Sequence, residues 1–194
     1  MATCSGVRKQ DIKLQYKQMK PLRIAITGPE CSGKSALVQQ LSEHFSEPFA
    51  AEYARDYLKK RDGVYTESDL LHICKGQIEL EEQAMRKADR MVFMDTDIMV
   101  IKIWSLFRFG TVHPAIETAN VSRRYDLRLL CYPDLPWEAD PLRESPDKEE
   151  RDLLFRLFRR QFEAMGEAFT VIRGTGEKRL ACAIEQLEKH FTTA

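Results

Sequence analysis

The sequence lacks the patterns that mark secreted, membrane-spanning and zinc-binding proteins. Its 5 cysteines are an odd number, include no C-x-x-C pair and show no metal-ligand spacing. We interpret them as the reduced thiols of a cytoplasmic protein. The first residues contain no apolar signal-peptide core, and no apolar run approaches the roughly 20 residues that span a bilayer. These absences predict a soluble protein without a membrane partner.

An excess of either charge is also missing. Lysine plus arginine number 30, aspartate plus glutamate number 30, and the formal net charge is +0. Without a global positive potential, the composition argues against a nucleic-acid partner and favours a small molecule. A chain of 194 residues is long enough to bury roughly 70% of its unfolded surface in one domain.

Short apolar runs alternate with segments of helical periodicity along the chain. Strands are expected at 22–27, 49–51, 91–94, 127–132 and 169–172, and helices at 36–45, 68–89, 98–107, 114–124, 153–165 and 177–191. This alternation predicts an α/β fold with a parallel sheet flanked by helices. The polar residues 1–20 are interpreted as an N-terminal extension and residues 21–194 as one domain. A segment at about 134–150, rich in proline, acid and arginine, is predicted to be a lid.

One segment carries a specific chemical signal. Residues 28–35 match G-x-x-x-x-G-K-[ST] between an apolar strand and a helix, where a P-loop must lie. Its backbone N–H groups and the helix dipole bind phosphate, Lys34 reaches the β- and γ-phosphates, and the Ser35 hydroxyl binds Mg²⁺. Cys31 is either a small residue at a variable position or a thiol activated by the helix terminus. The predicted ATP-binding residues here are Gly28, Glu30, Cys31, Ser32, Gly33, Lys34, Ser35 and Ala36.

Acidic residues follow two of the expected strands. Asp95 and Asp97 come after the third strand and Glu52 after the second, at the edge where open α/β sheets bind ligands. We assign Asp95 to Mg²⁺, and we take Glu52 and Asp95 as candidate catalytic carboxylates. Asp97 has two interpretations, a group that orients the substrate hydroxyl and a helix N-cap.

The predicted lid offers further candidates. Arg143 is a candidate to stabilise charge on the transferred phosphoryl group, and Arg55 and Arg151 are weaker ones. Trp137 lies near Asp140 in the same segment and is able to stack on a planar substrate ring.

These motifs together resemble one family. The segments at 28–35, 52–57 (E-Y-A-R-D-Y), 95–97 (D-T-D), 126–130 and 133–143 (P-D-L-P-W-E-A-D-P-L-R) are similar to the ribosylnicotinamide kinase domain of NadR-type bacterial proteins. The resemblance implies transfer of the ATP γ-phosphate to the ribose 5′-hydroxyl of nicotinamide riboside, giving nicotinamide mononucleotide. It also implies the P-loop NTPase fold, with about five parallel strands and residues 21–194 as the kinase domain. It makes Glu52 and Asp95 candidates for base and metal roles, and Trp137, Asp140 and Arg143 candidates for nucleoside and phosphate contacts. The candidate substrate-binding residues are in all Glu52, Tyr53, Arg55, Tyr57, Asp97, Trp137 and Asp140. The resemblance also places adenine at the turn that contains Thr175.

Two features separate this chain from full-length members of that family. Asp140 is followed by Pro141 where many relatives have glycine, and no H-x-G-H motif is present, so adenylyl transfer is not predicted. Two other functions stay open, a kinase for another nucleoside and a nucleotide-binding ATPase that acts as a regulatory switch. The arginine-rich helical segment 151–160 is the feature that supports a switch with an acidic partner.

Overall fold

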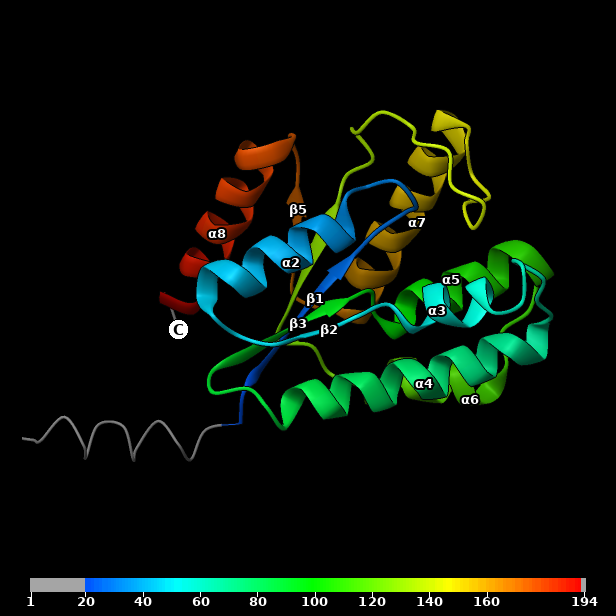
Figure 1. Ribbon diagram of the computed structural model, residues 1–194, viewed down its shortest axis with the longest axis horizontal. Coiled ribbons are helices and arrows are strands. Elements are labelled where there is room, and N and C mark those ends of the chain that lie inside the picture. Colours follow the sequence, from blue (N-terminus) through cyan, green and yellow to red (C-terminus); the bar gives the residue numbers. More distant parts are fainter. Residues whose placement is uncertain (1–19, 193–194) are drawn as a thin grey trace, which may run out of the picture.

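The structure is a computed structural model that describes residues 20–192, so the predicted N-terminal extension lies outside the described residues except for Lys20. Five parallel strands form one sheet in the order β2-β3-β1-β4-β5 (Figure 1). Their bounds are β1 Leu22–Thr27, β2 Phe49–Ala50, β3 Met91–Asp95, β4 Leu127–Cys131 and β5 Phe169–Ile172. The predicted number and direction of strands are confirmed.

Helices cover both faces of the sheet. Their bounds are α2 Lys34–Phe45, α3 Tyr53–Lys59, α4 Glu67–Met85, α5 Ile98–Phe109, α6 Pro114–Ser122, α7 Lys148–Met165 and α8 Gly176–Thr192. On β1, Ile24 and Ile26 pack with α2 and α8, while the intervening Ala25 faces the cluster that includes α4 residues. This alternation follows from the two-residue period of a strand. Both faces of the central strand are therefore buried, as the continuous apolar runs predict.

Two helical segments differ from the prediction. The short helix α3 is not among the predicted helices. It is held by packing against α4, where the ring of Tyr53 lies on Gly76. A Cβ atom at Gly76 would come within 2.3 Å of that ring, so the contact requires glycine. Helix α7 begins at Lys148 rather than at residue 153, because Asp147 accepts a hydrogen bond from the Glu149 N–H as its N-cap. The earlier start of α7 shortens the predicted lid to about 134–147.

Two further expectations concern the environment of the protein. Within residues 20–192, no helix has the length and the apolar character that a bilayer crossing requires. The four cysteines in this range, Cys31, Cys74, Cys131 and Cys182, are free thiols.

Candidate functional site

The carboxyl ends of the parallel strands bring the predicted site residues to one edge of the sheet. The P-loop follows β1, Asp95 ends β3, the lid follows β4, and the turn at 174–176 follows β5. Because β1 lies between β3 and β4, the phosphate loop has the acid on one side and the lid on the other (Figure 1). This is the edge at which ligands bind in open α/β sheets.

Glycines shape the P-loop. Gly28 and Gly33 have φ of 133° and 76°, and a Cβ on Gly28 would lie 2.7 Å from the carbonyl oxygen of Cys131. The loop is closed from within by the Ser32 hydroxyl, which donates to the Pro29 carbonyl at 2.7 Å. The Lys34 ammonium donates to the carbonyls of Gly28 and Pro29 at 3.0 and 2.9 Å. Phosphate-binding N–H groups are therefore available on a loop whose carbonyls already have donors.

Asp95 is the buried acid next to the loop. Asp95 is only 5% exposed, and its Oδ1 has no hydrogen-bond partner among the described residues. Burial raises the pKa of Asp95, while a hydrogen bond from Ser35 and the charges of Lys34 and Arg55 oppose that rise. An unpartnered buried oxygen beside a P-loop serine fits a hard cation such as Mg²⁺, which binds through oxygen ligands.

Glu52 completes the charged group at this edge. It precedes α3 at the N-cap position, but its side chain makes no capping hydrogen bond there. Burial raises the pKa of Glu52, the positive charge of Lys34 lowers it, and the negative charge of Asp95 raises it further. Perturbed carboxylates that interact with a lysine are typical of phosphoryl-transfer sites, although ion-pair networks produce the same pattern.

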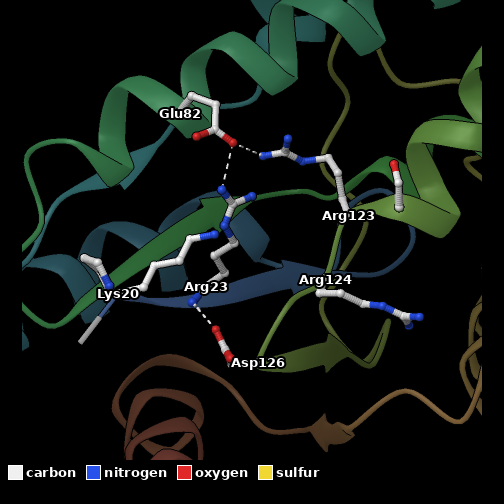
Figure 2. Close-up of a pocket in the computed structure, with 8 residues that line it drawn as sticks. Lys20, Arg23, Glu82, Arg123, Arg124 and Asp126 are labelled. Carbon is white, nitrogen blue, oxygen red and sulfur yellow. Dashed lines mark hydrogen bonds and ion pairs between the residues drawn. The ribbon is translucent and has the colours of Figure 1, made fainter. Parts of the chain in front are cut away.

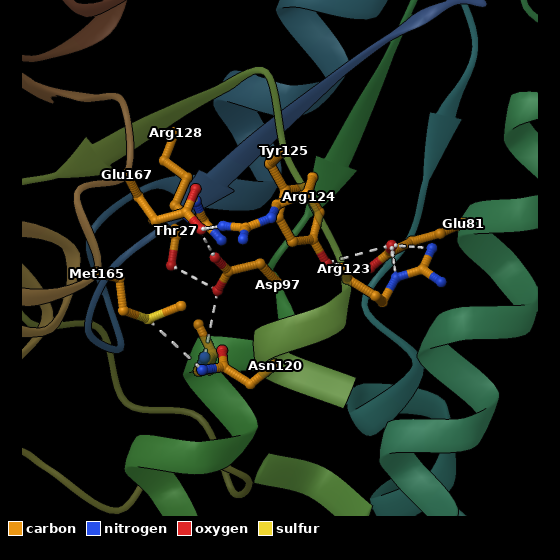
Figure 3. A network of polar contacts seen from close by, with 11 residues as sticks. Thr27, Glu81, Asp97, Asn120, Arg123, Arg124, Tyr125, Arg128, Met165 and Glu167 are labelled. Atoms are coloured by element: carbon orange, nitrogen blue, oxygen red, sulfur yellow. Dashed lines mark hydrogen bonds and ion pairs between the residues drawn. The ribbon is translucent and has the colours of Figure 1, made fainter. Parts of the chain in front are cut away.

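The structure corrects the assignment of Asp97 to the substrate. Asp97 is fully buried and accepts hydrogen bonds from the Thr27 hydroxyl at 3.0 Å and from the Arg128 Nε at 2.8 Å. It also caps α5 by accepting from the Val100 N–H. Arg128 in turn donates to Glu167 at 2.8 Å (Figure 3). Because groups inside the protein already donate to both of its oxygens, the structure favours the helix N-cap over the group that orients the substrate hydroxyl.

The side chains at two P-loop positions contact the lid instead of the phosphate side. Glu30 Oε2 accepts from the backbone N–H groups of Glu144 and Ser145 at 2.8 and 3.0 Å. The Cys31 thiol donates to the Pro136 carbonyl at 3.2 Å and accepts from Arg143 at 3.4 Å. The predicted roles of Glu30 and Cys31 in nucleotide binding therefore rest on their backbone N–H groups alone.

Within the lid, aromatic and charged groups are packed together. The guanidinium groups of Arg143 and Arg151 lie 5.8 and 5.0 Å from the ring centroid of Trp137. Asp140 pairs with Arg55 of α3 at 2.9 Å, so the lid touches the segment that follows β2. Arg151 is buried and donates to the carbonyls before α7, which removes it from the predicted basic outer surface.

The two tyrosines of the E-Y-x-R-x-Y segment are committed to packing. Tyr53 lies on α4 at Gly76, and its backbone N–H donates to the Gln77 side chain at 2.9 Å. The Tyr57 hydroxyl donates to Asp69 at 2.6 Å, and this bond is the main cause that lowers the pKa of Asp69 to about 2. Of the four residues that this segment contributes to the predicted acceptor site, Arg55 is the one that pairs with the lid, through Asp140.

A residue that the sequence reasoning missed joins the nucleotide side of the site. Arg179, in the first turn of α8, is 4% exposed and contacts the P-loop, the end of β4, the start of the lid and the turn at 174–176. Thr175, the predicted adenine contact, is exposed in that turn, and Ala36 is exposed in the first turn of α2. No local sequence signal identifies Arg179, because its partners lie between 5 and 147 residues away.

A cavity lies at the opposite edge of the sheet. It has a volume of about 390 Å³ and is lined near the starts of β1 and β4 by Lys20, Pro21, Arg23, Glu82, Ser122, Arg123, Arg124 and Asp126. Figure 2 shows Glu82 between Arg23 and Arg123, which donate to it at 2.7 and 3.0 Å. These charges pair with one another, so the cavity does not duplicate the P-loop as a phosphate site.

Comparison with known proteins agrees with this geometry. A family model described as an AAA domain matches residues 23–179. The trifunctional NAD biosynthesis/regulator protein NadR of Escherichia coli (strain K12) is 34% identical over 134 residues, which is 66% of this chain and 33% of that protein. The protein of the same description from Salmonella typhimurium (strain LT2) is 33% identical over 132 residues, 66% of this chain and 32% of that protein. The chain thus spans about a third of the length of these curated relatives.

Solved structures share the fold. A NadR protein crystallised in complex with NR has a TM-score of 0.74 at 20% identity, covering 92% of this chain and 53% of that one. A NadR protein in complex with NAD and AMP-PNP has a TM-score of 0.71 at 19% identity, covering 92% and 51%. A thymidylate kinase from Ehrlichia chaffeensis has a TM-score of 0.60 at 16% identity, covering 88% of this chain and 99% of that one. The resemblance to NadR-type proteins is confirmed, and the P-loop kinase fold with it.

Proposed function

The chain belongs to the AAA-domain family, and from that premise we propose that it is an ATP-dependent kinase that phosphorylates the 5′-hydroxyl of nicotinamide riboside. The product is nicotinamide mononucleotide, and the reaction belongs to NAD salvage in the cytoplasm. Free thiols at all four described cysteines support a reducing compartment. The relatives named NadR and the NadR structure in complex with NR support the choice of acceptor.

The observation that carries the proposal is the buried, unpartnered oxygen of Asp95 beside the P-loop. A P-loop protein that only binds nucleotide does not need a second raised-pKa carboxylate facing the same lysine, and here Glu52 is that second group. In phosphoryl transfer one acid serves the metal and another accepts the proton of the attacking hydroxyl. We assign these roles to Asp95 and Glu52 in that order.

The remaining roles follow from charge and position. Lys34 neutralises the transferred phosphoryl group, and the first residues of α2 bind the triphosphate through their N–H groups. Arg55 and Asp140 join α3 to the lid over the acceptor side. Trp137 offers a ring face to the planar base of a nucleoside, and Arg143, which contacts the Cys31 thiol of the P-loop at 3.4 Å, is assigned to the transferred phosphoryl group.

Magnesium fits the oxygens present. Ser35 and Asp95 would hold the ion, which supplies charge neutralisation at the β- and γ-phosphate oxygens when it is bound. Among the described residues there is no cluster of three or more His, Cys, Asp or Glu able to hold a metal by itself. This agrees with Mg²⁺ in such sites, because it is usually bound by few protein ligands, waters and the substrate phosphates.

The test is a direct assay of product. The purified chain is incubated with MgATP and a panel of nucleosides that includes nicotinamide riboside, and phosphorylated products are identified by mass spectrometry. We expect nicotinamide mononucleotide to form fastest. The Lys34→Ala variant serves as the control for contaminating kinases and should form none. Phosphorylation of another nucleoside in preference to nicotinamide riboside would replace the acceptor but keep the kinase.

The alternative of an ATPase switch makes a different prediction in the same assay. It requires slow ATP hydrolysis that no nucleoside accelerates and no phosphorylated nucleoside. The arginine-rich helix no longer supports it strongly, because Arg151 is buried and Arg159 pairs with Glu163 at 2.8 Å. Hydrolysis without acceptor phosphorylation would nevertheless establish the switch and contradict the kinase.

A further inference from the structure

We propose that Arg179 is a positioning residue for the nucleotide, which fixes the spacing between the P-loop and the turn at 174–176 so that phosphates and base bind together. The proposal rests on the proposed function in taking ATP as the nucleotide, and on the family resemblance in taking the turn that contains Thr175 as the adenine contact. It does not depend on the acceptor. Arg179 bonds to backbone carbonyls of both predicted ligand-binding segments, so we expect its effect on the nucleotide to pass through that backbone.

The guanidinium group joins four segments. Nη1 donates to the Ser32 carbonyl of the P-loop at 2.7 Å, and Nε donates to the Gly174 carbonyl of the turn at 2.7 Å. Nη2 donates to the Tyr132 carbonyl just after β4 at 3.1 Å and also pairs with Asp134 at the start of the lid. The second oxygen of Asp134 accepts from the Gly174 N–H at 2.8 Å, so the turn is held from two sides.

The P-loop explains why such a donor is needed. When the N–H groups of a phosphate loop face the ligand, the carbonyls face away from it and need partners of their own. The Ser32 carbonyl meets the guanidinium in the interior, where a carbonyl without a donor is unfavourable. Arg179 supplies this donor, and because the same guanidinium bonds to Gly174, the bond ties the P-loop backbone to the turn at 174–176.

The shape of the guanidinium turns these contacts into a fixed geometry. Arginine presents its donors in a rigid planar fork, whereas lysine has one flexible ammonium. With Nε on Gly174 and Nη1 on Ser32, the fork sets the distance and angle between turn and loop. Asp134 compensates the charge of the fork, which leaves the arginine structurally committed rather than available to a phosphate.

The inference predicts a selective loss of affinity in Arg179→Lys. Isothermal titration calorimetry with the full chain measures binding of MgATP and of magnesium tripolyphosphate, which has the phosphates but no base. We expect the Kd of ATP to rise about 30-fold, because two or more charge-assisted hydrogen bonds are lost. The Kd of tripolyphosphate should rise less than about 5-fold, because it uses the P-loop alone.

A matched control separates positioning from general loosening. Arg123→Lys changes another arginine of low exposure, paired with Glu81 at 2.8 Å near the opposite edge of the sheet. It should leave the Kd of both ligands within about twofold of the wild type. In addition, millimolar guanidinium should restore part of the ATP affinity of Arg179→Ala and none of that of Lys34→Ala.

Every outcome decides the proposal. Equal losses for ATP and tripolyphosphate would reduce Arg179 to a general support of the P-loop, and unchanged ATP affinity would overturn any role in binding. If Arg179→Lys does not fold, Asp134→Asn keeps the arginine but removes its counter-charge, and a loss confined to ATP would still be required. A wild type that binds ATP but phosphorylates no nucleoside would refute the proposed function and leave this inference standing. A wild type that binds neither ligand would refute both.

Discussion

Asp95 and Asp97 are only two residues apart, but their surroundings in the structure differ. At the carboxyl edge of the sheet, Asp95 is buried with an oxygen that lacks a partner among the described residues. Two residues later, Asp97 is also buried, but Thr27, Val100 and Arg128 donate hydrogen bonds to its oxygens. The D-T-D motif therefore contains one acid that is left available and one that is fully used.

The region around Asp97 is built to match its charges. Arg128 is fully buried between Asp97 and Glu167, and its guanidinium lies 4.7 Å from the ring centroid of Tyr125 (Figure 3). A neighbouring group joins the Tyr125 hydroxyl to Glu81 at 3.0 Å. Asp95 Oδ1 is one of several buried side-chain atoms without a partner among the described residues, and Nη2 of Arg128 is another. What indicates a functional site is that the unpartnered oxygen of Asp95 belongs to a carboxylate that interacts with Ser35 and Lys34 of the P-loop. The comparison teaches that neither burial nor a missing partner distinguishes a site by itself, whereas the two together with a place beside the P-loop do.

The largest expected effect concerns turnover in Asp95→Asn. If Asp95 holds Mg²⁺, the amide should lower kcat about 10³-fold, or ~4 kcal/mol in the barrier, because transition-state charge loses its counter-ion. The free energy of unfolding at neutral pH should stay the same or increase, because burial raises the pKa of Asp95 and so disfavours its ionised form in the folded state. Rates of product formation and urea unfolding measure the two quantities. Turnover near that of the wild type would reduce Asp95 to a structural residue.

The matching change, Asp97→Asn, should have the converse effect. It keeps an N-cap side chain for α5 but leaves Arg128 with Glu167 as its remaining carboxylate partner. Breaking a buried pair costs about 3–5 kcal/mol, and we expect about 3 kcal/mol here because one partner remains. Turnover per folded molecule should stay within about threefold of the wild type. A large loss of kcat without loss of stability would mean that Asp97 acts in catalysis, so that it would no longer differ in role from Asp95.

A smaller effect, on the KM of the nucleoside, tests the contact between the P-loop and the lid. In Glu30→Ala the N–H groups of Glu144 and Ser145 lose their shared acceptor. We expect the KM of the nucleoside to rise about 10-fold, or ~1.4 kcal/mol, because the lid is less well ordered over the acceptor. The Kd of ATP should change little, because the backbone of residue 30 is retained. An equal weakening of ATP would mean that Glu30 supports the P-loop rather than the lid.

The sequence predicts the elements of this fold better than the partners of individual side chains. The P-loop and the five strands have local signals, since each is a short apolar run or a fixed glycine spacing. Helix α3 depends on the fit of Tyr53 against Gly76, more than 20 residues away, and no local pattern reveals it. The start of α7 had a readable signal in Asp147 followed by two glutamates, which the prediction did not use.

The site shows the same division. Position alone indicates that Lys34, Ser35 and Asp95 belong together, because strand ends of a parallel sheet meet at one edge. Whether Asp97 is available to a ligand depends on its ion pair with Arg128. The sequence does not reveal this pair, because Arg128 is a single charged residue within the apolar run that forms β4. Arg179 is hidden for a related reason, because a helical arginine is usually solvated and its acceptors here are distant backbone carbonyls.

The smallest effect sharpens the comparison through the pKa of Glu52. The charge of Asp95 is among the causes that raise this pKa above its ordinary 4.5, whereas Asp97 is not. Asp95→Asn should therefore lower the pKa of Glu52, and Asp97→Asn should leave it unchanged; NMR titration of ¹³C-labelled glutamate carboxyls measures both. Because a raised carboxyl pKa means that stability falls as pH rises from the unfolded to the folded value, Asp95→Asn should also reduce this loss. Equal shifts of the Glu52 pKa in the two variants would show that the charge of Asp97 also acts on Glu52. The two aspartates would then differ in their hydrogen bonds but not in their electrostatic effect on Glu52.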